Sequence, residues 1–298
     1  MMDRKSTTTL TVDLHATSGE CSVKAMAEKV LSKTLAQFLC HLTALRGSDD
    51  PEAVHQARVA WRRFKTGLRL FKPAWHEFEP AKPSLTPLKP LLQGLGALRD
   101  LDVVLNETLP QWHRTYIDRG LKTRSAQARR RRDWRQMSQA LQRLADEHRC
   151  LVRSELERPA AVAALLALTT WVDGLSKVSV GETAATVTLQ HWARRRLADW
   201  HAHFKAVFKI GRHRSNPERQ HRTRILSKRL RYGVESLGFL LPAKRSRRWR
   251  QQAMEVQTKL GAARDLLQAC TLAASVAADD GILQFLQHVA DQATAQSS

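Results

Sequence analysis

The chain has 298 residues, of which 49 are Lys or Arg and 28 are Asp or Glu, so its formal net charge at pH 7 is +21. Hydrophobic residues make up 43% of the sequence, and this fraction together with the positive charge excludes an acidic, intrinsically disordered chain. Long stretches are rich in the helix formers Ala, Leu, Arg, Gln and Lys, while only 13 Gly, 10 Pro and 2 Tyr occur. We therefore expect a strongly basic, all-α protein.

Residues 1–20 contain acidic side chains and no continuous apolar segment, so they do not resemble a secretory signal. A flexible polar tail is expected there. The 4 cysteines lie far apart, without the C-x-x-C spacing of a zinc site or the dense spacing of a disulfide framework. Reduced thiols fit a cytoplasmic protein, and neither a metal nor a cofactor is expected. These cysteines are Cys21, Cys40, Cys150 and Cys270.

The first strongly periodic segment has apolar residues at steps of three and four, which is the spacing of one face of a helix. The apolar residues are Val54, Ala57, Trp61, Phe64, Leu68 and Phe71. The Pro-rich run 73–90, which contains Pro80, Pro83 and Pro87, is expected to end this helix and to separate it from the next.

The middle of the chain predicts two further helices and a linker. Apolar residues at helical spacing, Trp134, Met137, Leu141 and Leu144, indicate a long helix. Residues 160–168 are strongly apolar and follow Pro159, which suits the first turn of a helix. This stretch is shorter than the ~20 residues that span a membrane, so it predicts a buried core helix and no membrane contact. Residues 174–185, with several Gly and Ser, are expected to form a linker.

The second part of the chain repeats the first. HRTRILSKRLRYGVESL, from His221, matches HQARVAWRRFKTGLRLF, from His55, at a spacing of 221 − 55 = 166 residues. LGAARDL, residues 260–266, matches LGALRDL, residues 95–101, at a spacing of 260 − 95 = 165 residues. Upstream, two apolar residues of each half also correspond. The apolar matches are Leu31 with Leu197 and Phe38 with Phe204, and the second helix has its own apolar face of Leu226, Leu230, Val234, Leu237 and Leu241.

Three matching segments in the same order predict an internal duplication. The expected halves are residues 21–173 and 186–290, together forming one domain over 21–290. Because each half has room for about four long helices, the predicted architecture is two pseudo-symmetric helical bundles that face a shared basic groove.

Each repeated helix also carries a row of basic residues beside its apolar face. The first basic row is His55, Arg58, Arg62, Lys65 and Arg69, with Arg63 adjacent; the second basic row is His221, Arg224, Lys228 and Arg231, with Arg229 adjacent. Like charges one helical turn apart repel each other, so this spacing favours a bound polyanion. A single row of this kind is more often a solvated face, but solvation alone does not require two rows in the same register.

No catalytic motif stands out. The sequence lacks a Walker-type phosphate loop, H-E-x-x-H and G-x-S-x-G. Asp100 and Asp265 each follow an Arg in the repeated RD pair and are expected to orient basic side chains rather than to act as acids. His201 and His203 are two residues apart and would point in different directions on a helix, so they do not predict a shared metal.

The paired motifs resemble the CHAD family, the conserved histidine α-helical domain. The resemblance covers roughly residues 21–290 and implies an all-helical protein of two bundles, which binds inorganic polyphosphate non-catalytically along a basic surface between the halves. It also implies a cytoplasmic location, with polyphosphate granules as a candidate site. The implied polyphosphate-binding residues are His55, Arg58, Arg62, Arg63, Lys65 and Arg69, and His221, Arg224, Lys228, Arg229 and Arg231.

The two halves also differ. Leu267 and Gln268 stand where the first half has Asp102 and Val103, and Glu235 stands at the position of Arg69, so the second row is expected to bind less strongly. Further basic clusters, at residues 129–132, 194–196, 212–214 and 244–250, could extend the surface. The alternatives to polyphosphate binding are nonspecific, weak binding of nucleic acid, which the charge alone favours, and a polyphosphate kinase or phosphatase.

Overall fold

A computed structural model describes residues 21–75, 82–119, 123–175, 187–211 and 217–297. Every regular element in these ranges is a helix, which confirms the all-α prediction. The tail 1–20, most of the expected linker 174–185, Pro80 and the basic cluster 212–214 lie outside the described residues.

The helices of the first half precede residue 174 and those of the second half follow residue 187. The first half contains α1 (Val23–Ala44), α2 (Pro51–Trp75), η2 (Thr86–Leu88), α3 (Lys89–Val103), η3 (Val104–Thr108), α4 (Leu109–Asp118), α5 (Arg124–Glu157) and α6 (Pro159–Asp173). The second half contains α7 (Leu189–Gly211), α8 (Pro217–Leu237), η4 (Gly238–Leu240), α9 (Ala243–Lys259), α10 (Ala262–Ser275) and α11 (Asp280–Ser297).

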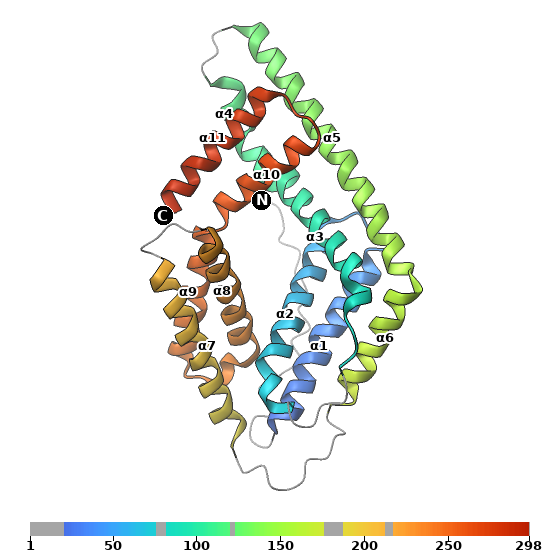
Figure 1. Ribbon diagram of the computed structural model, residues 1–298, viewed down its shortest axis with the longest axis vertical. Helices are drawn as coiled ribbons and strands as arrows, with labels where there is room; N and C mark the ends of the chain where they lie inside the picture. Colours follow the sequence, from blue (N-terminus) through green and yellow to red (C-terminus); the bar gives the residue numbers. More distant parts are fainter. Residues whose placement is uncertain (1–20, 76–81, 120–122, 176–186, 212–216, 298) are drawn as a thin grey trace, which may run out of the picture.

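Figure 1 shows an elongated molecule with two columns of helices in its lower part and a joined upper part. One column consists of α7, α8 and α9, the other of α1, α2 and α6, and α5 runs along the outside from the upper tip. The halves meet where α2 contacts α8 and where α10 contacts α3 and η3. At the top, α11 reaches α4, because the ring of Phe285 lies 6.4 Å from Trp112 and 5.2 Å from Tyr116.

The two repeated helices pack in the same way against the helix that precedes each. A Cβ added to Gly67 of α2 would lie 3.0 Å from Cδ2 of Leu31, and one added to Gly233 of α8 would lie 3.1 Å from Cδ2 of Leu197. Because the absent side chain lets each helix pair approach closely, glycine at this position serves the same packing in both halves. This agreement is consistent with the duplication.

The predicted apolar faces of α2 and α8 are both buried in the core. Trp61 of α2 packs against Phe38 and Phe64 with ring centroids 4.9 and 5.5 Å away. These contacts confirm the helical periodicity that the sequence predicted. The Pro-rich run separates α2 from α3 as expected, although α2 continues through Pro73 to Trp75, and Pro90 lies in the first turn of α3.

The core helix expected at residues 160–168 is present, but only one of its faces is buried. The α6 helix begins at Pro159 and buries one face, which includes Leu168 and Trp171. Its other face is open, because Val162 is 46% and Leu166 is 68% exposed. The helix is apolar all round, and apolarity alone does not indicate which side meets a neighbour. Among the described residues, no helix combines the length and apolar character that crossing a membrane requires.

Candidate anion-binding surface

The two basic rows lie on helices that contact each other, α2 and α8. We define the central cationic surface as Arg58 and Arg62 of α2, Arg224 and Lys228 of α8, and Arg264 of α10. These cations act on one another electrostatically: Arg62 disfavours the charge on Arg58, Arg224 and Lys228, while Arg264 does the same to Arg58, Arg224 and Lys228. The surface therefore joins charges from both halves of the chain.

The pKa of Lys228 shows the effect of these neighbouring charges most clearly. Burial, followed by the positive charges of Arg62 and Arg224, lowers this pKa to about 7. At neutral pH the amine is thus divided between its charged and neutral forms. Burial is also the main reason why the pKa of Arg58 falls to about 10, with Arg62 adding to the effect and Asp100 opposing it. An anion at this surface would favour the charged form of both groups.

Arg58 rests against the repeated LGALRDL segment on α3. A Cβ added to Gly96 would lie only 2.9 Å from Nη1 of Arg58, so the missing side chain makes room for the guanidinium. Asp100, one helical turn after Gly96, faces the same charge and favours it. The pattern G-x-x-x-D thus holds an arginine of α2 in place. Nε of Arg58 is buried and has no hydrogen-bond partner within the described part of the chain.

The corresponding segment on α10 is built differently. A Cβ on Gly261 would meet the backbone oxygens of Gln257 and Thr258, at 2.9 and 3.4 Å, rather than an arginine side chain. Asp265 does favour the charge on Arg224, and burial raises the pKa of Asp265 while Arg224 lowers it. This arrangement fits the expectation that the RD aspartates orient basic groups. Sequence reasoning did not select Arg264, although it stands in the RD pair of the repeat.

Two of the predicted ligands have a carboxylate of the chain itself beside them. Glu235 of α8 forms ion pairs with Arg63 of α2 at 3.3 Å and with Arg231 at 3.6 Å. Both guanidinium groups also lie over the ring of Tyr232, at 5.9 and 4.7 Å from its centroid. The Arg63–Glu235 pair therefore links α2 to α8, while the Arg231–Glu235 pair lies within α8. The sequence marked Glu235 as a departure but did not indicate its partner, which lies 172 residues away.

The two histidines that begin the rows have different surroundings. His55 is partly buried, and burial followed by the charge of Arg99 lowers its pKa. His221 is exposed at the second turn of α8. Near His55, the π-helical turn η3 carries Glu107, whose carboxylate accepts a hydrogen bond from Arg99 at 2.8 Å. The sequence did not predict this π-helical turn.

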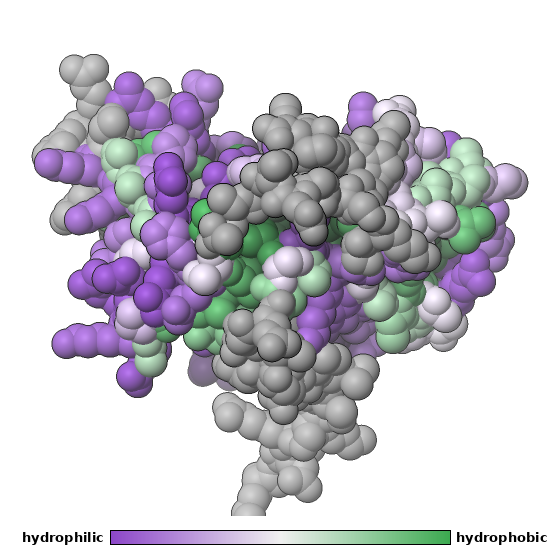
Figure 2. Space-filling model, turned by 90° about the horizontal axis from the view of Figure 1, so that it is seen from below, coloured by the Kyte–Doolittle hydropathy of each residue, from purple (hydrophilic) through white to green (hydrophobic). Residues whose placement is uncertain are grey.

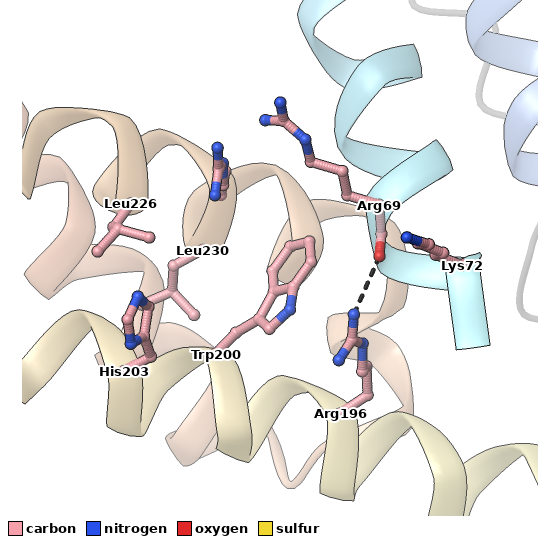
Figure 3. A pocket seen from close by; sticks show the side chains of 8 residues that line it. Arg69, Lys72, Arg196, Trp200, His203, Leu226 and Leu230 are labelled. Carbon is pink, nitrogen blue, oxygen red and sulfur yellow. Dashed lines mark hydrogen bonds between the residues drawn. The ribbon is translucent and has the colours of Figure 1, made fainter. Parts of the chain in front are cut away.

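At the lower end of the rows, Lys65, Arg69 and Arg229 lie close enough to affect one another. Burial, then Arg69 and Arg229, lowers the pKa of Lys65, and burial followed by Arg69 lowers that of Arg229. Here α7 supplies Arg196, which donates a hydrogen bond to the backbone oxygen of Leu70 at 3.1 Å. It donates another to that of Arg69 at 3.0 Å (Figure 3).

Other basic clusters are used at least partly for packing. Arg194 donates to the backbone oxygen of Leu240 at 3.2 Å, and Arg130 donates to those of Tyr116 and Arg119 at 2.7 and 2.8 Å. In the cluster 244–250, Arg245 lies over the ring of Trp249, 5.9 Å from its centroid. Arg130 and Arg194 thus attach to the ends of neighbouring elements, and Arg245 covers an indole of its own helix.

The described residues contain no group of three or more His, Cys, Asp or Glu side chains that could hold a metal ion. All 4 cysteines are free thiols.

Comparison with known proteins points to one family. A family model described as the CHAD domain matches residues 29–274. A crystal structure of the CHAD domain from the plant Ricinus communis is 25% identical and superposes with a TM-score of 0.71, covering 93% of this chain and 87% of the plant chain. A search among curated proteins found no match.

Proposed function

The chain belongs to the CHAD domain family, and from this premise we propose that it binds inorganic polyphosphate at the central cationic surface without turning it over. The observation that carries the proposal is that the charge of Arg62 on α2 disfavours the charge of its neighbour Arg58 and that of Lys228 on α8, in the other half. A bound polyanion relieves this repulsion, and a linear polymer can contact both helices at once.

The chemistry of the side chains fits phosphate. Arginine offers two parallel N–H donors to phosphate oxygens, and lysine acts as a compact charge. Displacement of the counterions around a polymeric anion makes affinity fall steeply with salt concentration, as it does for nucleic acids. The polymer is expected to follow the rows beyond the central surface, along His55, Lys65 and Arg69 on α2 and His221 and Arg229 on α8. Arg63 and Arg231 would join it only by leaving Glu235.

A binding role suits the carboxylates near the surface better than catalysis does. Asp100 and Asp265 each face an arginine whose charge they favour, which is a positioning task. The sequence also lacks the phosphate loop that nucleotide-dependent kinases of the Walker type carry. Incubation of the pure protein with labelled polyphosphate tests this part: we expect no release of labelled phosphate, and turnover that follows protein concentration would contradict it.

Nucleic acid is the second candidate, because a net charge of +21 attracts any polyanion. Readers of single strands stack bases on exposed aromatic rings, whereas at the central cationic surface Trp61, which directly precedes Arg62 on α2, is only 7% exposed. A competition assay with fluorescent DNA separates the two candidates. We expect long-chain polyphosphate to displace the DNA at a lower charge concentration than unlabelled DNA requires. Equal or weaker displacement would make nucleic acid the better ligand.

A protein that binds polyphosphate is expected on cytoplasmic polyphosphate granules.

A further inference from the structure

At the lower end of the molecule, a cavity of about 260 Å³ lies between α2 of the first half and α7 and α8 of the second. Figure 2, which views this end, shows hydrophilic side chains over the flank formed by α7 and α9 and apolar side chains toward the centre. The cavity is bordered by Arg69 and Lys72 on the α2 side, while its apolar wall comes from α7 and α8 (Figure 3).

The apolar wall consists of Trp200, Leu226 and Leu230. Trp200 projects from α7 toward α8 and α2 (Figure 3), and a Cβ on Gly233 would lie 3.2 Å from its Cζ3, so glycine is needed where the indole sits. The guanidinium of Arg196 lies 5.4 Å from the centroid of the indole ring. Because Arg196 is itself anchored on two carbonyls of α2, it fixes the position of the indole.

The rim of the cavity is cationic. Arg69, Lys72, Arg196 and Arg229 border it together with His203, and no carboxylate is among its lining residues in the described part of the chain. This differs from the centre of the α2–α8 contact, where Glu235 pairs with Arg63 and Arg231. Arg229 and Arg69 also belong to the basic rows, so the cavity opens beside the lower end of the proposed polyphosphate path.

A linear chain of phosphates has no apolar surface to place against an indole and two leucines. The wall and the rim together suit a ligand that combines a flat aromatic group with several negative charges. A volume of about 260 Å³ is slightly below the roughly 300–1,000 Å³ typical of sites for whole small molecules, so it fits the aromatic group alone. The charged part then lies outside, over the rim.

We propose that this cavity binds the base of a nucleoside di- or triphosphate against Trp200, with the phosphates held by Arg69 and Arg229. The contact with the base relies on its aromatic face, so purines and pyrimidines both fit, as in other stacking sites. Because the phosphates lie on the lower end of the rows, a nucleoside triphosphate and long-chain polyphosphate compete there.

The test compares ATP with inorganic tripolyphosphate, which carries at least as much negative charge but has no base. Calorimetric titrations of the whole protein at one salt concentration, without added metal, give both affinities. Stacking of a base on an aromatic side chain contributes about 1–3 kcal/mol, so we expect ATP to bind about tenfold more tightly than tripolyphosphate. Equal affinities, or tighter binding of tripolyphosphate, would overturn the proposal without any variant being needed.

Two variants of Trp200 locate the effect. Trp200→Leu is expected to reduce the affinity for ATP to that for tripolyphosphate, while Trp200→Phe, which keeps an aromatic ring, retains most of the difference. Trp112→Leu, which removes a partly buried tryptophan at the opposite end of the molecule, is the matched control and should leave the difference intact. A preference for ATP that survives in Trp200→Leu would place the base elsewhere.

The same titrations keep this inference separate from the proposed function. Trp200→Leu is expected to leave the affinity for long-chain polyphosphate unchanged, because no part of the polymer needs the indole. If wild-type protein failed to bind long-chain polyphosphate but preferred ATP to tripolyphosphate, the proposed function would fail and the cavity would stand. If the protein bound long-chain polyphosphate but did not prefer ATP to tripolyphosphate, only the proposed nucleotide site would be contradicted.

Discussion

The two halves of the chain carry the same motifs but stabilise them by different means. In the first half, Arg149 of α5 lies against Asp102 of α3 at 3.9 Å and against Asp146 and Asp49 at 2.9 and 3.5 Å. Asp102 is only 2% exposed. In the second half Leu267 stands at the position of Asp102 and is 45% exposed, so this position holds an exposed apolar side chain in place of a buried carboxylate.

The two basic rows are also stabilised by different contacts in the two halves. Arg58 of the first half is seated on Gly96, whereas Gly261 of the second half approaches only backbone oxygens. The second half contributes Lys228, whose pKa lies near neutrality, and Glu235, which neutralises part of its own row. The comparison teaches that a duplicated motif can keep its charges and divide its tasks: the first half places an arginine against a glycine, and the second supplies a lysine whose pKa lies near neutrality.

Reversing one charge in each half should have the largest effect. Arg58→Glu combined with Arg224→Glu is expected to lower the affinity for long-chain polyphosphate by more than about 100-fold, because two charged hydrogen bonds of about 1.5–3 kcal/mol each are lost and repulsion is added. Filter retention of labelled polymer measures the change, and circular dichroism checks the helical content. Arg131→Glu with Arg135→Glu, on the exposed face of α5, changes the net charge equally and should weaken binding far less. Similar losses in both double variants would show that only the net charge matters.

The buried network predicts a difference in stability between the halves. Arg149→Met removes the cation that most favours the buried carboxylate of Asp102 and leaves only the weaker influence of Arg99, so the free energy of unfolding should fall by about 3 kcal/mol. Urea denaturation measures this change. Leu267→Asp, which places the same carboxylate at the exposed equivalent position of α10, should change it by less than about 0.5 kcal/mol. Equal changes in the free energy of unfolding for the two variants would contradict the proposed difference between the halves.

Binding of polyphosphate should depend on pH through Lys228. Its pKa near 7 in the free protein rises when a polyanion binds, so binding takes up as much as one proton above that pH. Affinity should therefore fall as pH increases from 7 to 9, by at most about tenfold per pH unit. The other charged groups that face Lys228 are Arg62, Arg224, Arg231, Arg264 and Asp265. Lys228→Arg should flatten the pH profile, and a slope that persists in this variant would assign the titration to another group.

Substitution of the two repeated glycines should give the smallest effects, and of different kinds. Gly96→Ala displaces the guanidinium of Arg58 and should lower the affinity for polyphosphate a few-fold with little loss of stability, since a long side chain can move. Gly261→Ala meets backbone oxygens and should lower stability rather than affinity. Parallel measurements of polyphosphate affinity and urea denaturation distinguish these outcomes. A loss of affinity in both variants would mean that the two motifs do the same task.

Much of the fold followed from local patterns. The apolar periodicity of α2 and α8 identified their buried faces, and the matched glycines Gly67 and Gly233 lie in equivalent contacts. The open face of α6 did not follow, because a uniformly apolar helix gives no periodic signal for the side that packs. Of the predicted boundaries, the tail and the linker lie largely outside the described residues.

For the candidate site, the sequence indicated which residues carry charge but not which charges cancel. The pairing of Arg63 with Glu235 depends on how α2 meets α8, and no local spacing encodes a contact across 172 residues. The roles of Arg196 and Trp200 likewise arise where α7 meets the end of α2. Arg264 could have been selected earlier, because it belongs to the repeated RD pair.

The most direct test of the account is a crystal structure of the protein with bound polyphosphate. We expect one continuous chain of phosphates that contacts Arg58 and Arg62 on α2 and crosses to Arg224 and Lys228 on α8. Phosphate density confined to one helix, or lying over the Arg-rich surface of α5 or α9, would contradict the claim that the two halves hold the polymer together.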